Sequence, residues 1–306
     1  MTGAADVDVL VPTRDRPDAL AVTLAGLAAQ SVTGFRVVVS DQSEREPAIS
    51  APAVQAMLRV LRQRGCAVRT GRHLPARGLA EHRAHLLSQA RAPYLLTLDD
   101  DVWLEPDALA TLLEAIGELR CGFVGMSVIG LSYAADVRPH EHAAYEAWDG
   151  PVRPERVRKG TPGWERWRLH NAANPLHLAG RRGLRSGWSA YKVAWVAACV
   201  LYDRAALLDC GGFDFWTDVG EPAHCGEDVV AQLRVMERYG GAGLLPSRAY
   251  HLELPTTVPD RRVDCYDVVL GPGSPAGLTD RGQTGDNRDN GGPGPSPVRA
   301  PAAPAD

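Results

Sequence analysis

Short apolar runs alternate with segments of helical periodicity through the first 130 residues. The strand-like runs stand at residues 7–12, 35–41, 66–71, 94–98 and 121–130. Between them, apolar side chains recur every three or four positions, as in the helix expected to begin at Pro17. Repeated strand–helix units of this length predict an α/β fold with a mostly parallel, open sheet flanked by helices.

The regular alternation stops near residue 131 and resumes near residue 190. The stretch 131–190 carries four tryptophans with many Arg and Pro, and we expect it to form an irregular insert. After it, the pattern predicts a strand at 193–203 and helices at 204–214 and 227–239. From residue 271 onward almost no large apolar side chain occurs, so burial cannot offset the loss of conformational entropy. The segment 271–306 is therefore predicted to be a disordered tail.

The composition argues against several classes of protein. A net charge of −4 over 306 residues gives no basic excess for nucleic-acid binding. Six scattered cysteines without a Cys-x-x-Cys pair disfavour structural zinc or a disulfide framework and favour a reducing cytoplasm. The sequence starts without the pattern of a secretory signal, and its longest apolar run is shorter than the ~20 residues of a membrane span. We expect a cytoplasmic protein without a transmembrane segment, with peripheral membrane contact left open.

Three consecutive carboxylates, Asp99 to Asp101, follow the apolar run 94–98 directly. No Lys or Arg lies within four residues of the triplet, so its charges repel one another without a local counter-ion. In an open parallel sheet, ligands bind beyond the carboxyl ends of the strands. There, Mg²⁺ or Mn²⁺ is held by one or two carboxylates together with the oxygens of a phosphate. The triplet predicts such a site, with a solvated turn and helix cap as the alternative.

Five motifs occur in a recognisable order, namely VDVLVPTRDRP, VVVSDQSE, ARGLAEHRAHLLSQARAPYLLTLDDD, CGGFD and GEDVVAQLR. Together they resemble the family 2 glycosyltransferases of the GT-A fold, over residues 6–130 and 190–252. The resemblance implies one domain over 1–270, in which 6–130 bind a nucleotide sugar and 131–270 face the acceptor. It implies transfer of a sugar from a UDP-, dTDP- or GDP-linked donor to an acceptor hydroxyl, with Mn²⁺ or Mg²⁺ and with inversion. The acceptor could be a glycan, a lipid-linked molecule or a small natural product.

The resemblance also assigns roles to single residues. Contacts with the donor nucleotide are implied for Pro12, Thr13, Arg14, Asp41, Gly78, Arg83, Asp99 and Asp100. Asp101 would bind the metal, and His251 would complete its shell. Asp228, in the GED motif at a helix start, would take the proton from the acceptor hydroxyl. The acceptor side would include Trp188, Trp216 and Glu227.

Each role has a structural alternative. Asp41 could be a turn residue, and Arg83 a solvated helix residue. Asp228 could be a first-turn carboxylate that interacts favourably with the helix dipole. His251 could be an ordinary loop residue. The HEH sequence at 140–142 is interpreted as a surface loop rather than a metal site.

The sequence departs from the family pattern at several places. Gln42 stands where many members have a second Asp, and Val230 where many have an Asp after the acidic pair. The insert 131–190 is the largest departure and is expected to decide the acceptor. The sequence lacks the signatures of rival α/β proteins. No Gly-rich loop follows the first strand, as dehydrogenases and sugar-nucleotide pyrophosphorylases require, and no Walker motif of an NTPase occurs. A non-catalytic nucleotide-sugar-binding or partner-binding protein with the same fold remains the alternative.

Overall fold

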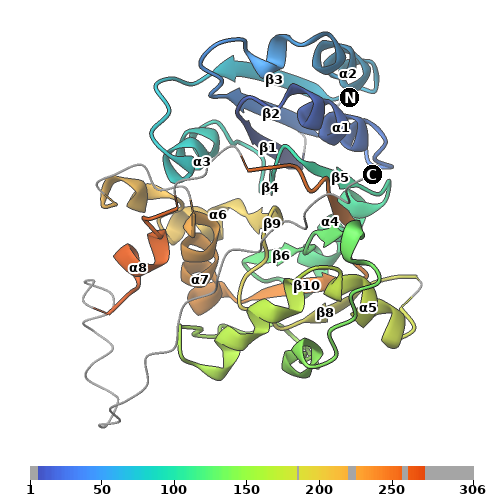
Figure 1. The fold of residues 1–306 in the computed structure, drawn as a ribbon, viewed down its shortest axis with the longest axis vertical. Coiled ribbons are helices and arrows are strands. Elements are labelled where there is room, and N and C mark those ends of the chain that lie inside the picture. Colours follow the sequence, from blue (N-terminus) through green and yellow to red (C-terminus); the bar gives the residue numbers. More distant parts are fainter. Residues whose placement is uncertain (1–5, 185, 220–224, 257–260, 273–306) are drawn as a thin grey trace, which may run out of the picture.

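The computed structural model describes residues 6–184, 186–219, 225–256 and 261–272. Its centre is an eight-stranded sheet in the order β3-β2-β1-β4-β9-β6-β10-β8 (Figure 1). The strands are β1 (Val7–Thr13), β2 (Arg36–Asp41), β3 (Ala67–Arg72), β4 (Tyr94–Leu98), β6 (Phe123–Gly125), β8 (Ser189–Tyr191), β9 (Cys199–Asp203) and β10 (Gly241–Leu245). β1 to β4 pair in parallel, as do β6 and β10, whereas β8 and β9 run antiparallel to their neighbours. The predicted α/β class with a mostly parallel sheet is confirmed.

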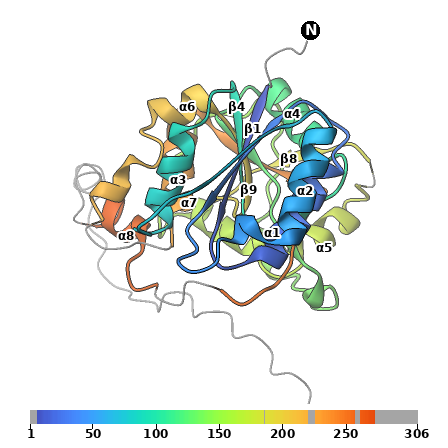
Figure 2. The ribbon, with the colours of Figure 1, turned by 90° about the horizontal axis from the view of Figure 1, so that it is seen from above.

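Helices cover both faces of this sheet (Figure 2). They are α1 (Pro17–Ala28), α2 (Pro52–Gln63), α3 (Leu79–Ser88), α4 (Ala108–Leu119), α5 (Asn174–Arg181), α6 (Arg204–Asp209), α7 (Glu227–Tyr239) and α8 (Cys265–Val269). Side chains alternate along β1, so Val9 belongs to the core that contains Leu24 of α1, and Leu10 to the core that contains Leu86 of α3. Within the described residues, none of these helices is long and apolar enough to cross a bilayer.

A second, three-stranded sheet has the order β5-β11-β7. Its strands are β5 (Val102–Leu104), β7 (Ile129–Gly130) and β11 (Ala249–His251). The apolar run 121–130, predicted as one strand, divides into β6 and β7, which belong to different sheets. β11 pairs antiparallel with β5, and this register sets His251 opposite Val102, directly after the acidic triplet. The small sheet therefore brings a residue from the far end of the chain to the end of β4.

The chain before β9 differs from the prediction of a strand over 193–203, because only its last five residues are strand. In the part of the predicted strand that precedes β9, the side chain of Gln232 of α7 binds the backbone where a neighbouring strand would otherwise pair. Its amide oxygen accepts a hydrogen bond from Val196 N at 2.7 Å, and its amide nitrogen donates to Val196 O at 2.7 Å. The backbone then turns at Ala198, where φ is 67°. Side-chain hydrogen bonds across 36 residues thus override the apolar pattern.

The insert is irregular, as predicted, but it contains α5, β8 and several short 3-10 helices. His142 of the HEH sequence is buried, with its Nε2 3.0 Å from Asn174 Oδ1, so the expectation of a surface loop is wrong for this residue. The helix predicted at 204–214 ends at Asp209, because Gly211 and Gly212 adopt positive φ values of 85° and 56°. Of the predicted tail, residues 273–306 lie outside the described residues, and the domain boundary at 270 stays a prediction.

Candidate active site

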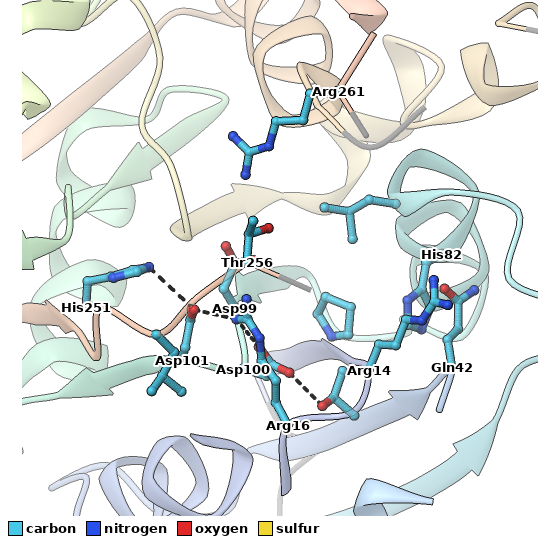
Figure 3. Close-up of a pocket in the computed structure, with 14 residues that line it drawn as sticks. Arg14, Arg16, Gln42, His82, Asp99, Asp100, Asp101, His251, Thr256 and Arg261 are labelled. Atoms are coloured by element: carbon cyan, nitrogen blue, oxygen red, sulfur yellow. Dashed lines mark hydrogen bonds and ion pairs between the residues drawn. The ribbon is translucent and has the colours of Figure 1, made fainter. Parts of the chain in front are cut away.

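A cavity of about 310 Å³ opens beyond the carboxyl ends of β1, β2 and β4 (Figure 3). It is lined by Pro12, Thr13, Arg14, Arg16, Gln42, Leu79, His82, Asp99, Asp100, Asp101, His251, Leu254, Thr256 and Arg261. Asp101 and His251 lie at one end, and Gln42 and His82 at the other. The location is where an open α/β sheet binds its ligands. Seven of the residues predicted from the sequence share this cavity, namely Pro12, Thr13, Arg14, Asp99, Asp100, Asp101 and His251.

Asp100 is anchored by two threonines from the neighbouring β1 and α1. Thr13 Oγ1 donates to Asp100 Oδ2 at 2.6 Å, and Thr23 Oγ1 donates to the carbonyl of Asp100 at 2.8 Å. Burial raises the pKa of Asp100 to about 7, against the lowering effect of the Thr13 hydrogen bond, and the Asp101 charge raises it further. The second carboxylate of the triplet therefore fixes the loop and also lines the cavity.

Asp101 lies between two groups that can carry positive charge. Its Oδ2 is 2.6 Å from Arg16 Nη1 and 3.5 Å from His251 Nε2. Burial and the neighbouring Asp99 charge raise the pKa of Asp101, and His251 and Arg16 oppose that shift. The missing local counter-ion of the triplet is thus supplied from 85 residues away in the sequence.

The pairing of Asp101 with His251 suits a divalent cation, because a carboxylate oxygen and an imidazole nitrogen are both ligands that Mn²⁺ accepts. Within the described residues, no group of three or more His, Cys, Asp or Glu side chains is placed to hold a metal ion. A cation at Asp101 and His251 would therefore take its remaining ligands from water and from substrate oxygens, as Mg²⁺ commonly does at phosphate sites. The donor set fits a metal that binds together with a diphosphate.

Arg83 of α3 joins the acidic triplet to α7. Its Nη2 donates to Asp99 Oδ1 at 2.7 Å and its Nε to Glu227 Oε1 at 2.9 Å, with the arginine side chain 5% exposed. The nearby carboxylates raise the pKa of Arg83 despite its burial, so the guanidinium stays charged. The solvated alternative for Arg83 is wrong, and its predicted contact with the nucleotide stays a prediction because the residue lies behind the cavity wall.

Asp228 follows Glu227 in the first turn of α7, after Gly226 at a positive φ of 77°. It is half-buried, and its Oδ1 accepts a hydrogen bond from Val229 N at 2.8 Å. Burial, followed by the charge of Glu227, raises the pKa of Asp228 to about 8, and the charge of Asp99 adds to the effect. Asp228 does not line the cavity itself but adjoins it through Glu227 and Arg83. Its role as a base stays a prediction.

The opposite end of the cavity holds two side chains that the sequence did not single out for a role. Gln42 is 4% exposed, and its Nε2 is buried without a hydrogen-bond partner among the described residues. His82 is also buried, with its Nε2 2.8 Å from Ser40 Oγ, and burial lowers its pKa to about 3. An amide and a neutral imidazole form a polar wall at this end, with Arg14 beside them.

Two predicted donor residues lie behind the wall. Asp41 is fully buried, and its carboxylate accepts hydrogen bonds from Ser43 N at 2.7 Å and Ile49 N at 3.1 Å. Gly78 precedes α3 with φ 112°, a conformation that favours glycine. Both shape the loops that carry the wall, and neither is among its lining residues. Their contact with a nucleotide stays a prediction.

The residues predicted for the acceptor side are dispersed. Trp188 packs against the core and its indole N–H donates to Glu114 Oε2 at 3.3 Å. Trp216 lies in the 3-10 helix Asp214–Thr217, which packs against α3. Glu227 is buried against Arg83. None of the three lines the described cavity, and their roles remain untested.

Arg16 is the main charged residue of the cavity that sequence reasoning missed. The signal was present, because Arg16 lies in the loop after β1 and directly before the helix-starting Pro17. Its partner could not be read from the sequence, since the contact to Asp101 spans 85 positions. In the sequence, Gln42 stands out only as a departure from the family pattern. The structure shows that this departure places an amide on the cavity wall.

Comparison with known structures finds partial similarities at low identity. TarS 1-349 of S. aureus in complex with UDP-GlcNAc has a TM-score of 0.49 and 18% identity, covering 82% of this chain and 59% of that chain. The longer S. aureus TarS has a TM-score of 0.47 and 17% identity, covering 80% of this chain and 36% of that chain. The mannosyltransferase PcManGT from Pyrobaculum calidifontis, in complex with GDP-Man and Mn²⁺, has a TM-score of 0.45 and 16% identity. The alignment covers 79% of this chain and 57% of that chain. This chain therefore spans between about a third and three fifths of the length of these structures. A comparison with curated proteins gives no match.

The sequence profile described as Glycosyl transferase family 2 matches residues 8–183. The match includes all of β1 except Val7, the acidic triplet after β4 and most of the insert. It covers more than half of the 306 residues, and the chain therefore belongs to glycosyl transferase family 2.

Proposed function

We propose that this chain transfers a sugar from a nucleotide diphosphate sugar to a hydroxyl group of an acceptor. One observation supports the proposal most strongly. The contacts from Asp99 through Arg83 to Glu227 set the donor-side carboxylates beside Asp228, although these residues come from three separate elements. A protein that only binds a nucleotide has no need of a second acidic group at this place. The membership in a glycosyl transferase family is consistent with this arrangement.

The cavity suits a nucleotide diphosphate because it combines uncharged polar side chains with guanidinium groups. Gln42 and His82 offer an amide and a neutral imidazole for a base, whether uracil, thymine or guanine. Arg14 and Arg16 line the cavity and provide guanidinium groups, which bind phosphate oxygens well. Mn²⁺ or Mg²⁺ at Asp101 and His251 would neutralise charge on the departing diphosphate.

Asp228 is the proposed base. In its deprotonated form the carboxylate accepts the proton of the acceptor hydroxyl while that oxygen attacks the anomeric carbon. Arg83 holds Glu227 and Asp99 at fixed positions, so the base stays close to the donor carboxylates. Attack from the face opposite the diphosphate would invert the anomeric configuration.

The test is a screen of UDP-, dTDP- and GDP-sugars with and without Mn²⁺, read as melting temperature and as release of the nucleotide diphosphate. A bound donor at 100 times its Kd stabilises the folded state by about 2.7 kcal/mol, which gives a measurable shift. Glycan, lipid-linked and small-molecule acceptors are then added, and NMR of the product reads the anomer. A response to no nucleotide would contradict the proposal and favour a protein that binds a partner without catalysis.

A further inference from the structure

Arg16 is turned into the cavity by the short loop between β1 and α1. The backbone at Asp15 adopts a positive φ of 57°, and Asp15 N donates to Ser43 Oγ at 2.9 Å, which fixes the turn. Pro17 starts α1 immediately afterwards. As a result, Arg16 lies among the carboxylates of the triplet, while Arg14 lies toward His82 and Gln42 (Figure 3).

The guanidinium of Arg16 is held tightly at the proposed metal position. Its Nη1 is 2.6 Å from Asp101 Oδ2 and 3.4 Å from Asp100 Oδ1, and its Nη2 donates to the carbonyl of Pro255 at 2.9 Å. The side chains of Arg16 and Asp101 are 16% and 7% exposed, so water screens the pair only weakly. The third donor, Nε, is buried without a partner in the described residues. An unpartnered buried donor is costly, which suggests that this is not the only partner set of Arg16.

We propose that Arg16 occupies the place of the metal on Asp101 until the donor binds. This inference rests on the proposed metal at Asp101 and His251. A divalent cation bonded to Asp101 Oδ2 would stand beside a guanidinium bonded to the same oxygen, and the two positive charges would repel each other. The cation and Arg16 therefore compete for one carboxylate oxygen, and the nucleotide-free protein binds the cation weakly.

The donor diphosphate resolves the competition because it offers Arg16 a second anion. Guanidinium groups pair well with phosphate oxygens through two parallel hydrogen bonds. When Arg16 turns to the diphosphate, Asp101 becomes free for the cation, which can also bind the same diphosphate. Binding of donor and metal is then positively coupled, and each raises the affinity of the other by the same factor.

The experiment is a titration of the nucleotide-free protein with Mn²⁺, read by electron paramagnetic resonance of the unbound ion. Three proteins are compared, namely wild type, Arg16→Gln and Arg14→Gln. Arg14 is the matched control, since it lines the same cavity and loses the same charge but pairs with Asp15 and Glu44 at the surface. We expect Arg16→Gln to bind Mn²⁺ about tenfold more tightly than wild type, and Arg14→Gln to change by less than about threefold.

Two further measurements test whether Arg16 and the cation compete for Asp101. Arg16→Gln should melt at a lower temperature than wild type without metal and recover more when Mn²⁺ is added, because Mn²⁺ replaces the lost counter-charge. Adding Asp101→Asn to Arg16→Gln should remove the gain in affinity. Equal Mn²⁺ affinity in wild type and Arg16→Gln, an equal gain in Arg14→Gln, or no Mn²⁺ binding by Arg16→Gln would each overturn the proposal. The titration contains no nucleotide, so a failure of all nucleotides to bind would defeat the proposed function separately.

Discussion

Residues 6–130 and the insert that follows them are held in place by different interactions. The first region is built from regular strand–helix units whose cores follow the apolar periodicity. One of its buried ion pairs braces neighbouring strands, since both oxygens of Asp8 accept hydrogen bonds from Arg36 at 2.7 and 2.6 Å. Asp8 also accepts hydrogen bonds from the backbone of Arg91 and Ala92, so it ties β1 to β2 and to the chain before β4.

The insert depends instead on charged side chains that reach between segments. Arg166 is buried and contacts Glu155 at 2.8 Å and Glu146 at 2.9 Å, and Lys192 also contacts Glu146 at 2.8 Å. Arg158 pairs with Glu237 of α7 in the same way. A chain without periodicity has few regular backbone hydrogen bonds, so such contacts set its path. The difference teaches that apolar periodicity sets the path of the donor region, whereas ion pairs between irregular segments set the path of the insert.

The largest effect is expected for Asp228→Asn, a change that lies outside both of these regions. This variant separates proton transfer from the donor binding proposed for residues 6–130. We expect the rate of transfer to fall about 1000-fold, because a general base is lost, while donor affinity stays within about twofold. Steady-state kinetics and calorimetry with the donor measure the two quantities. Glu237→Gln, on the same helix but paired with Arg158, is the control and should keep its activity. Transfer by Asp228→Asn at the wild-type rate would remove Asp228 from the mechanism.

Asp8→Asn tests the brace of the first region. The change leaves Arg36 with a neutral partner and weakens four hydrogen bonds, and we expect a loss of about 3 kcal/mol in the free energy of unfolding. Unfolding in urea measures the loss. Asp18→Asn, at an exposed position of α1, should change the stability by about 0.5 kcal/mol or less. A similar small change in Asp8→Asn would show that the brace is dispensable.

Arg166→Met tests the insert. Methionine keeps the aliphatic packing but removes the charge that Glu146 and Glu155 share, and we expect a loss of about 2 kcal/mol, since both carboxylates can still reach water. Hydrogen exchange should show faster exchange in 141–170 and unchanged exchange in β1 to β4. The exposed Arg168→Met serves as the control. Loss of protection throughout the first region would contradict the division into two kinds of stabilisation.

The pH dependence of transfer should report Asp228. Its pKa of about 8 means that the base form is a minority at pH 6, so kcat/KM should rise about tenfold per pH unit and level off above pH 8. The stability contribution has the opposite sign, because the folded protein binds the proton more tightly than the unfolded chain. Stability from this group is therefore lost as pH rises from about 4 to about 8. A flat rate profile over this range would contradict the assignment.

Gln42→Leu should give the smallest effect, at the base end of the cavity. Removing a buried amide whose Nε2 has no partner in the described structure should leave the melting temperature of the free protein unchanged or higher. Nucleotide affinity should fall about tenfold if the amide binds the base. Calorimetry with UDP and GDP and a thermal melt distinguish the two outcomes. A lower melting temperature with unchanged affinity would make Gln42 a structural residue.

Much of the fold could be predicted from the first 130 residues. The apolar run of β1 and the period of three to four in α1 are local patterns, so they are visible in the sequence itself. The acidic triplet was correctly placed at a strand end for the same reason. The short strands β5 and β11 were not predicted, nor was β7 as a strand separate from β6, because two or three residues carry no detectable period.

The sequence alone therefore determined the fold class, the position of the triplet and the family of the chain. Only the tertiary structure decided which charges meet. Arg16 pairs with Asp101 across 85 positions and Arg83 with Glu227 across 144. The physical reason is that periodicity is a property of neighbouring residues, whereas an ion pair depends on how distant elements pack, which no local pattern encodes.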